Sequence, residues 1–237
     1  MACTGTKLPV VVLEAPLATP STIWKPVVRA LRHEVPDQRV CTYDGAQIGK
    51  SARVGAHTID DSVADLHALI ADGIDAGPVV LVGYSYGGLI TRLLAARHPD
   101  DVAALVLVDP TPVGFHDQGR QYIKPSALKD FVGTGAAKFE QVEPLDRAAA
   151  RTGVASVPGS LAAPLTVIHA AGGLEVPFAR SRGAARALDD LVAQLQRATL
   201  ALSVESNLVT AKSVHTRVLQ DEPEVVADAI VAIRART

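Results

Sequence analysis

The chain has 237 residues, of which 48% are hydrophobic and 20% are charged, and its formal net charge is −2. This length and composition predict one globular domain with a full core and exclude an intrinsically disordered protein. Because the charge is nearly balanced, no basic surface is expected for nucleic acid or an anionic membrane, and the predicted partner is a small molecule.

Two cysteines, Cys3 and Cys41, are too few for a disulfide framework in a chain of this size, and Cys41 is expected to be a buried free thiol. The first residues lack a basic segment followed by a long apolar one, and no apolar run approaches the roughly 18 residues of a membrane-spanning helix. We therefore expect a cytoplasmic protein, either a monomer or a homodimer.

Short apolar runs that predict buried strands alternate with amphipathic stretches that predict helices. The strands are expected at residues 9–14, 39–43, 78–83, 103–109, 164–170 and 208–213, and the helices at 23–34, 59–74, 86–98, about 179–200 and 222–234. Ser21 and Thr22 could cap the first helix, and Thr58 with Asp61 predicts a capping box for the second. The alternation indicates the α/β class, with a mostly parallel sheet of about six strands and helices on both faces.

Residues 111–161 interrupt this alternation with about fifty residues that contain four prolines and no clear strand. Loops of that length without secondary structure are uncommon inside a compact domain. The segment is therefore predicted to be an inserted helical cap, and residues 1–110 and 162–237 are predicted to form the core.

The most informative motif is Gly83-Tyr84-Ser85-Tyr86-Gly87, which lies between a predicted strand and a predicted helix. A serine on a sharp strand-to-helix turn stands clear of the sheet, and the flanking glycines let the strand and the helix approach closely. The N–H groups at the start of the helix point at the site where negative charge would develop on a substrate oxygen. Ser85 is thus the predicted nucleophile.

Four segments together resemble the α/β-hydrolase fold family: Gly83–Gly88, His98–Asp100, Leu105–Pro110 and the segment around His215 with Pro223 downstream. The resemblance covers the chain from Pro9 to about Arg234. Because Pro9 corresponds to the start of the third strand of that fold, the first hairpin is expected to be missing.

The resemblance implies a Ser–acid–His triad in this chain order, with His215 as the base. Asp109, at the end of a predicted strand, is the favoured acid, since some members, including lactone-hydrolysing ones, place the acid there. The alternative acid is Glu175, which lies in the turn where many other members carry an aspartate.

The oxyanion hole is expected to use the backbone N–H of Tyr86 and that of Leu17, in the loop after the first predicted strand. Relatives usually have glycines in that loop, whereas this chain has Pro16 and Ala18, and Gln47 replaces another common glycine further along. Pro16 has no N–H to donate, which leaves Leu17 or Ala18 as the donor.

Trp24, Phe115, Tyr122 and His116 are predicted to contact the substrate, on the basis of their positions alone. The histidines show no spacing typical of a metal site, so neither a metal nor a cofactor is expected.

These features predict a serine hydrolase that cleaves a small carboxylic ester or lactone through an acyl-enzyme. Two alternatives remain open because the oxyanion loop departs from the usual pattern. One is a non-hydrolytic enzyme of the same fold, such as a biosynthetic cyclase, a rearrangement enzyme or a perhydrolase. The other is a ligand-binding member without catalytic activity.

Overall fold

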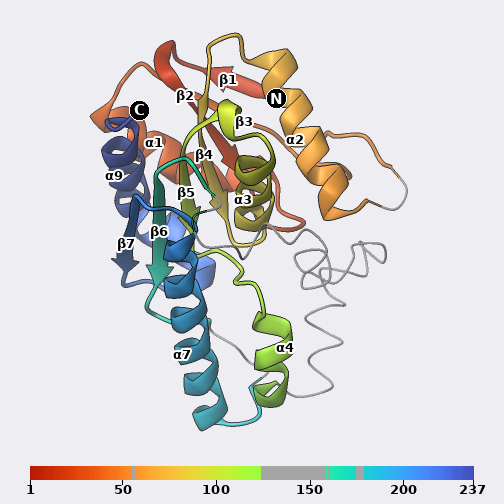
Figure 1. The fold of residues 1–237 in the computed structure, drawn as a ribbon, viewed down its shortest axis with the longest axis vertical. Helices are drawn as coiled ribbons and strands as arrows, with labels where there is room; N and C mark the ends of the chain where they lie inside the picture. The colour runs from red at the N-terminus through yellow and green to blue at the C-terminus, as the bar shows by residue number, and fades with distance from the viewer. Residues whose placement is uncertain (55–56, 124–158, 160, 175–178) are drawn as a thin grey trace.

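The computed structural model describes residues 1–54, 57–123, 159, 161–174 and 179–237. They form a seven-stranded sheet with helices on both faces, which confirms the predicted α/β class (Figure 1). The strand order is β1-β3-β2-β4-β5-β6-β7, and all neighbours are parallel except β1 and β3. The strands are β1 (Ala2–Thr4), β2 (Lys7–Glu14), β3 (Gln38–Thr42), β4 (Val79–Tyr84), β5 (Val102–Val108), β6 (Leu165–Ala170) and β7 (Ser206–Ala211).

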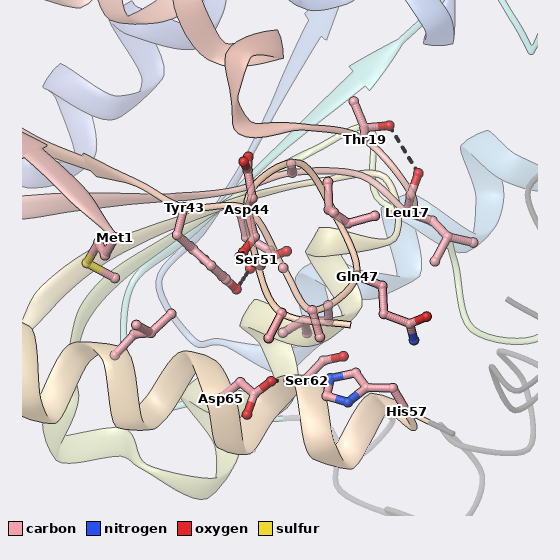
Figure 2. Close-up of a pocket in the computed structure, with 18 of the residues that line it drawn as sticks. Met1, Leu17, Thr19, Tyr43, Asp44, Gln47, Ser51, His57, Ser62 and Asp65 are labelled. Atoms are coloured by element: carbon pink, nitrogen blue, oxygen red, sulfur yellow. Dashed lines mark hydrogen bonds and ion pairs between the residues drawn. The ribbon is translucent and has the colours of Figure 1, made fainter. Parts of the chain in front are cut away.

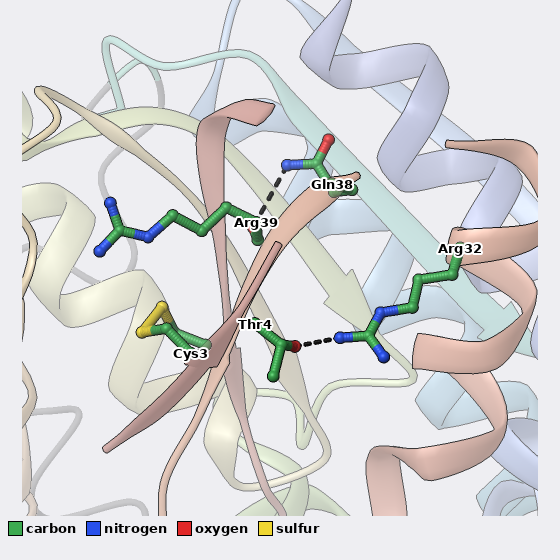
Figure 3. The surroundings of a disulfide bond; sticks show 6 residues. Cys3, Thr4, Arg32, Gln38 and Arg39 are labelled. Atoms are coloured by element: carbon green, nitrogen blue, oxygen red, sulfur yellow. Dashed lines mark hydrogen bonds between the residues drawn. A yellow bond between two sulfur atoms is a disulfide. The ribbon is translucent and has the colours of Figure 1, made fainter. Parts of the chain in front are cut away.

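The six predicted strands are all present, but the short edge strand β1 was not expected. β1 pairs antiparallel with β3, and this register sets Cys3 opposite Cys41. The two sulfurs form a disulfide across the edge of the sheet (Figure 3), so the prediction of a free thiol at Cys41 is wrong. The two cysteines are 38 residues apart in the sequence, and only the strand pairing brings them together.

Beside the disulfide, the Arg32 guanidinium donates a hydrogen bond to the Thr4 hydroxyl and links β1 to the first helix (Figure 3). The resemblance predicts that the first hairpin of the family's fold is missing. The structure has one short strand, β1, ahead of β2. The cytoplasmic location expected from the sequence stays a prediction.

The sheet is covered by one helical layer on each face because successive strand side chains point in opposite directions. Val10 and Val12 pack in the core beneath α2 (Ile59–Gly73) and α3 (Gly87–Arg97). Val11 and Leu13 pack in the opposite core, with residues of α1 (Lys25–Glu34) and α9 (Pro223–Arg234). The remaining elements are α4 (Phe115–Gly119), α7 (Arg182–Ala198), α8 (Val218–Asp221), η1 (Ser21–Trp24), η2 (Pro99–Asp101), η3 (Arg120–Tyr122), η5 (Thr199–Leu202) and η6 (His215–Arg217).

The predicted capping box at the start of α2 is present. The Asp61 N–H donates to the Thr58 hydroxyl at 3.1 Å, and the Thr58 N–H donates to the Asp61 carboxylate at 2.8 Å. The predicted cap of α1 is wrong, because η1 precedes that helix. Ser21 instead donates hydrogen bonds to the Asp44 carboxylate from both its N–H and its hydroxyl, each at 2.8 Å.

The described part of the predicted cap consists of α4 and η3, whose buried side chains pack on α7. Residues 124–158 and 160 lie outside the described residues, so the cap stays a prediction. Among the helices that are described, none has both the length and the apolar character required to cross a membrane.

Candidate active site

Ser85 lies on a sharp turn between β4 and α3, as the motif predicts. Its φ of 53° is in the left-handed region, which non-glycine residues rarely adopt. The turn is held by backbone hydrogen bonds, since the Ser85 N–H donates to the Val108 carbonyl and the Ser85 carbonyl accepts from Gly88 and Thr111, all at 3.0 Å. Backbone strain of this kind persists only where the surrounding structure fixes it. The turn presents the half-buried Ser85 side chain beyond the carboxyl ends of the strands.

The glycines that flank the turn are required by close packing. A Cβ at Gly83 would lie 2.5 Å from the Gly87 carbonyl oxygen. A Cβ at Gly87 would lie 2.6 Å from the Ala15 carbonyl oxygen, in the loop that follows β2. Gly87 therefore sets how closely the predicted oxyanion loop approaches the turn that carries Ser85.

Replacing Gly87 by alanine is expected to displace this loop, because the new methyl group would meet backbone atoms that cannot rotate away. We expect the unfolding free energy to fall by about 1–3 kcal/mol, as for other overpacked sites. Ester turnover should fall as well, while the same change at Gly183 in α7, outside the cavity lining, should have little effect, because a Cβ there would meet only Ser181 Oγ at 3.8 Å. Urea unfolding and kcat for both variants test this, and equal effects at the two glycines would contradict it.

Asp109 occupies the position on β5 that corresponds to Ser85 on β4. Tyr84 and Val108 are paired in the parallel register, so Ser85 and Asp109 each follow a paired residue at the same sheet edge. Asp109 also has a positive φ, of 37°. Ser85 and Asp109 thus follow the ends of adjacent strands, and each backbone turns there with a positive φ.

His215 begins η6, four residues after the end of β7. Its ring nitrogen Nδ1 is hydrogen-bonded to the Asp109 carboxylate oxygen Oδ2. The backbone N–H of His215 donates to the Gly173 carbonyl at 2.9 Å. The Tyr84 hydroxyl donates to the His215 carbonyl oxygen. With Nδ1 engaged by Asp109, Nε2 is the ring nitrogen left to accept a proton.

The Asp109 carboxylate is 2% exposed and is held by several donors. Its Oδ1 accepts hydrogen bonds from the Ala170 N–H and the Gln196 side-chain amide, each at 2.9 Å. The Nδ1 of His169 is 3.7 Å from Oδ1, too long for a hydrogen bond, and is bonded instead to the Gln196 oxygen at 2.8 Å. Gln196 therefore fixes both Asp109 and His169.

Burial by itself would raise the pKa of Asp109. The interactions of the carboxylate with His169, His215 and the Ala170 N–H outweigh burial and hold its pKa well below the usual range. The nearby Asp109 carboxylate in turn raises the pKa of His169. Asp109 is therefore an anion throughout the physiological pH range, as the third member of a triad must be to stabilise an imidazolium.

The loop after β2 follows the sheet edge beside Ser85. It turns tightly, with the Thr19 N–H donating to the Pro16 carbonyl at 3.1 Å and the Thr19 hydroxyl donating to the Leu17 carbonyl at 3.0 Å. Ala18 has a φ of 57° and Gln47 a φ of 65°. Both residues stand where relatives usually have glycine, and both adopt the left-handed conformation that glycine favours. The backbone shape is thus kept although the glycines are replaced.

A cavity of about 610 Å³ lies beside the predicted oxyanion donors (Figure 2). Its described walls come from residues 14–19, from the loop at 43–54, from α2 and from α3. Leu17 and Tyr86 both line it, whereas Ser85 and His215 do not. The cavity therefore begins at the oxyanion loop and extends away from the serine toward α2.

Glu14 is the last residue of β2 and a buried wall residue of this cavity, with 6% exposure. Its carboxyl group accepts a hydrogen bond from the Tyr43 hydroxyl. Burial raises the pKa of Glu14 well above its ordinary value. The proton on Glu14 is thus bound more tightly in the folded protein than in the unfolded chain.

This difference makes stability depend on pH in a definite direction. Between the ordinary pKa of glutamate and the raised pKa in the fold, the native state holds a proton that the unfolded chain has released. The unfolding free energy should therefore fall as the pH rises through this window, and Glu14→Gln should remove that fall. Urea unfolding of both proteins from pH 4 to pH 8 tests this, and parallel pH profiles would contradict it.

A family model described as the alpha/beta hydrolase fold matches residues 9–155. The chain belongs to the α/β-hydrolase fold family. Among the curated proteins of this family, the chain is 45% identical to the lipase LipV of Mycobacterium tuberculosis over 112 residues, which are 47% of this chain and 42% of LipV. It is 31% identical to the pimeloyl-[acyl-carrier protein] methyl ester esterase of Aliivibrio salmonicida over 109 residues, which are 46% of this chain and 39% of that esterase. The matches thus span less than half of these relatives.

Solved structures of α/β-hydrolases match almost the whole chain. An enol-lactonase from Burkholderia xenovorans superposes with a TM-score of 0.65 at 17% identity, covering 99% of this chain and 95% of that structure. A thermophilic esterase from Thermogutta terrifontis superposes with a TM-score of 0.67 at 18% identity, covering 99% and 92%. At such identities the likeness establishes the fold and not the substrate.

One of the residues predicted to contact substrate is contradicted by the structure of this α/β-hydrolase, and the other three stay predictions. Trp24 is completely buried and contacts the Tyr84 ring edge to face in the α1 and α9 core, so its assignment to a pocket wall is wrong. Phe115 is buried and Tyr122 half-buried against α7, and neither is among the described lining of the cavity. His116 lies in α4, but its side chain is outside the described structure, as is all of Glu175.

Three site residues were missed in the sequence. Gln196 projects from the last turn of α7 toward Asp109, at a helical position that looks like an ordinary amphipathic one. Glu14 ends an apolar run, and Tyr43 lies at the end of the next one. A charged residue that directly follows a buried strand is a signal that could have identified Glu14, since such residues gather at the ligand-binding edge of an α/β sheet.

Away from this edge, the described residues include one group with metal-ligand chemistry: His67, His98 and Asp101. His67 Nε2 is 3.0 Å from the Asp101 carboxylate, and the two imidazole rings are stacked with centroids 3.6 Å apart. The hydrogen bond to the carboxylate and the ring stacking join α2 to the end of α3, and these contacts explain why the three side chains lie together.

Proposed function

We propose that this α/β-hydrolase is a serine hydrolase that cleaves a small carboxylic ester or lactone. The observation that carries the proposal is that a strained Ser85 and a buried, ionised Asp109 follow adjacent strands at the same end of the sheet, and that Asp109 is bound to His215 Nδ1. Each part matches a role in acyl transfer: a hydroxyl on a strained turn, a base in a fixed tautomer, and an anion that stabilises the imidazolium.

In the first step, Ser85 Oγ attacks the carbonyl carbon of the ester while His215 Nε2 takes the hydroxyl proton. The carbonyl electron pair moves onto oxygen, which would be bound by the backbone N–H groups of Tyr86 and Leu17. The tetrahedral intermediate then collapses, the bond to the alcohol oxygen breaks, and that oxygen takes the proton from His215. The acyl group remains on Ser85.

In the second step, His215 takes a proton from water, whose oxygen attacks the acyl carbon and forms a second tetrahedral intermediate. Its collapse releases the carboxylic acid, and Ser85 Oγ recovers the proton from His215. Asp109 keeps its negative charge throughout and holds the imidazole in position. A lactone follows the same path, except that the leaving alcohol stays attached to the acyl chain.

The relatives support this reading at the level of the reaction class, since the matched proteins are named lipase, methyl ester esterase and enol-lactonase. A fluorophosphonate that reacts with activated serines tests it directly. The expected result is one covalent adduct on the peptide that contains Ser85, detected by mass spectrometry, and loss of that adduct in His215→Ala. A folded protein that remains unlabelled would overturn the proposal and favour the non-hydrolytic or ligand-binding alternative.

A further inference from the structure

The cavity beside the oxyanion loop has an unusual distribution of charge. Its described lining includes four carboxyl side chains, from Glu14, Asp44, Asp65 and Asp72, and neither lysine nor arginine. The basic side chain along the described lining is His57, whose Nε2 lies 3.3 Å from the Asp65 carboxylate. Because burial raises the pKa of Glu14, the three aspartates carry the negative charge of this wall, although the chain as a whole is nearly neutral.

The individual carboxyl groups occupy defined positions. The Asp44 carboxylate accepts hydrogen bonds from the Ser21 N–H and hydroxyl at 2.8 Å, and the Lys50 N–H lies 3.4 Å from its other oxygen. The Ser21 N–H is the strongest influence that keeps the pKa of Asp44 low, so this group is an anion at neutral pH. Asp65, on α2, lies 3.3 Å from His57 and is more than half exposed (Figure 2).

Two tyrosines complete the wall. Tyr43 and Tyr86 are 8% and 6% exposed, and both contribute to the lining of the cavity. A tyrosine ring attracts a cation, and a quaternary ammonium group in particular, when the cation lies over the ring face, because that face carries negative charge density. The aspartates repel an anionic group, and the described lining has no lysine or arginine that could bind one.

The position of the cavity relates it to the reaction. Tyr86 and Leu17, the expected oxyanion donors, belong to its wall. If the carbonyl oxygen of an ester is bound by these two N–H groups, one of the two arms of that ester extends into the cavity. The chemistry of that arm is then selected by the acidic and aromatic wall.

We propose that this cavity selects esters whose arm on the oxyanion side carries a cationic group, in preference to a neutral group of the same shape, and that it rejects anionic ones. This inference rests on the proposed hydrolase function and specifies its substrate class. A trimethylammonium group is the simplest member of the class, since it combines a positive charge with a size suited to an aromatic wall.

The test compares pairs of esters that differ in charge but not in shape. Choline butyrate and 3,3-dimethylbutyl butyrate differ only by nitrogen in place of carbon in the alcohol arm. The same replacement in the acyl arm, with 4-(trimethylammonio)butanoyl and 5,5-dimethylhexanoyl esters of one alcohol, covers the opposite orientation and keeps the charge too far from the carbonyl to activate it strongly. For one of the two pairs, kcat/KM of the cationic ester is expected to be about tenfold higher at low ionic strength, and the preference should shrink with added salt.

The matched variants identify the wall as the origin of the preference. The double change Asp65→Asn and Asp72→Asn removes two exposed carboxylates of α2 and should reduce the cationic-to-neutral ratio by about three- to fivefold. Asp190→Asn, at an exposed position on α7 outside the cavity lining, should leave the ratio unchanged. A ratio near one for both pairs, or one that the double variant does not alter, would overturn the inference.

Failure of the inference and failure of the proposed function give different results. Hydrolysis of the neutral esters that depends on Ser85, without a cationic preference, overturns the inference and leaves the hydrolase intact. If no ester is cleaved and Ser85 is not labelled by the fluorophosphonate, the hydrolase proposal fails. Binding of tetramethylammonium and of neopentyl alcohol, measured by calorimetry, then still tests the cavity, and tighter binding of the alcohol contradicts its cation preference.

Discussion

Replacing Ser85 by alanine is expected to lower kcat for ester hydrolysis by about 10⁴-fold or more, while the protein remains folded. The variant lacks the only atom that could form the acyl-enzyme in the proposed mechanism, and the oxyanion donors and the cavity can supply only the residual rate. Alanine is smaller than serine, and Ser85 is held through its backbone, so the turn should be retained.

The measurement is kcat for a small activated ester with purified wild-type and variant proteins, with circular dichroism to confirm the fold. Ser206→Ala is the matched control, because Ser206 is exposed at the start of β7, far along the strand from the sheet edge that carries Ser85. Activity that survives in Ser85→Ala would assign the hydrolysis to another group and refute the proposed nucleophile.

The second large effect is expected for Asp109→Asn, with a loss in kcat of about 10⁴-fold. An amide at this position can still accept from the Ala170 N–H and the Gln196 side chain. It carries no charge to stabilise the imidazolium, and its NH₂ group would face His215 Nδ1 and favour the wrong tautomer. The loss should therefore fall on kcat, with a much smaller change in KM.

Glu175→Gln is the informative comparison, since Glu175 was the alternative acid and lies outside the described residues. We expect this variant to retain most of its kcat, because His215 Nδ1 is already bound to Asp109. Measuring kcat for both variants across pH 5 to 9 tests the assignment. A larger loss in Glu175→Gln than in Asp109→Asn would show that the acid has been misassigned.

Much of the candidate site could be predicted because its parts follow local rules. The elbow motif between an apolar strand and a helix located Ser85, and the family's chain order pointed to Asp109 and His215. Six strands and their parallel arrangement follow from short apolar runs separated by helical periodicity. The capping box at Thr58 is also local, since it depends on residues three apart.

The errors have a common cause in contacts between distant segments. Cys3 meets Cys41 through the pairing of β1 and β3, and Trp24 is buried in the core against the Tyr84 ring. Ser21 binds Asp44 across 23 residues instead of capping its own helix. Positions and motifs could not reveal which partner each of these side chains would reach.

The sequence by itself determined the fold class and pointed to Ser85 and His215 as candidate catalytic residues, with Asp109 or Glu175 as the acid, because strand, turn and helix signals depend on neighbouring residues. Only the tertiary structure decided which groups hold Asp109, where the cavity lies and what charge its wall carries. Gln196, Glu14, Tyr43 and Asp65 come from four separate elements, and their chemistry depends on burial and proximity that arise only when the sheet and its helices pack together.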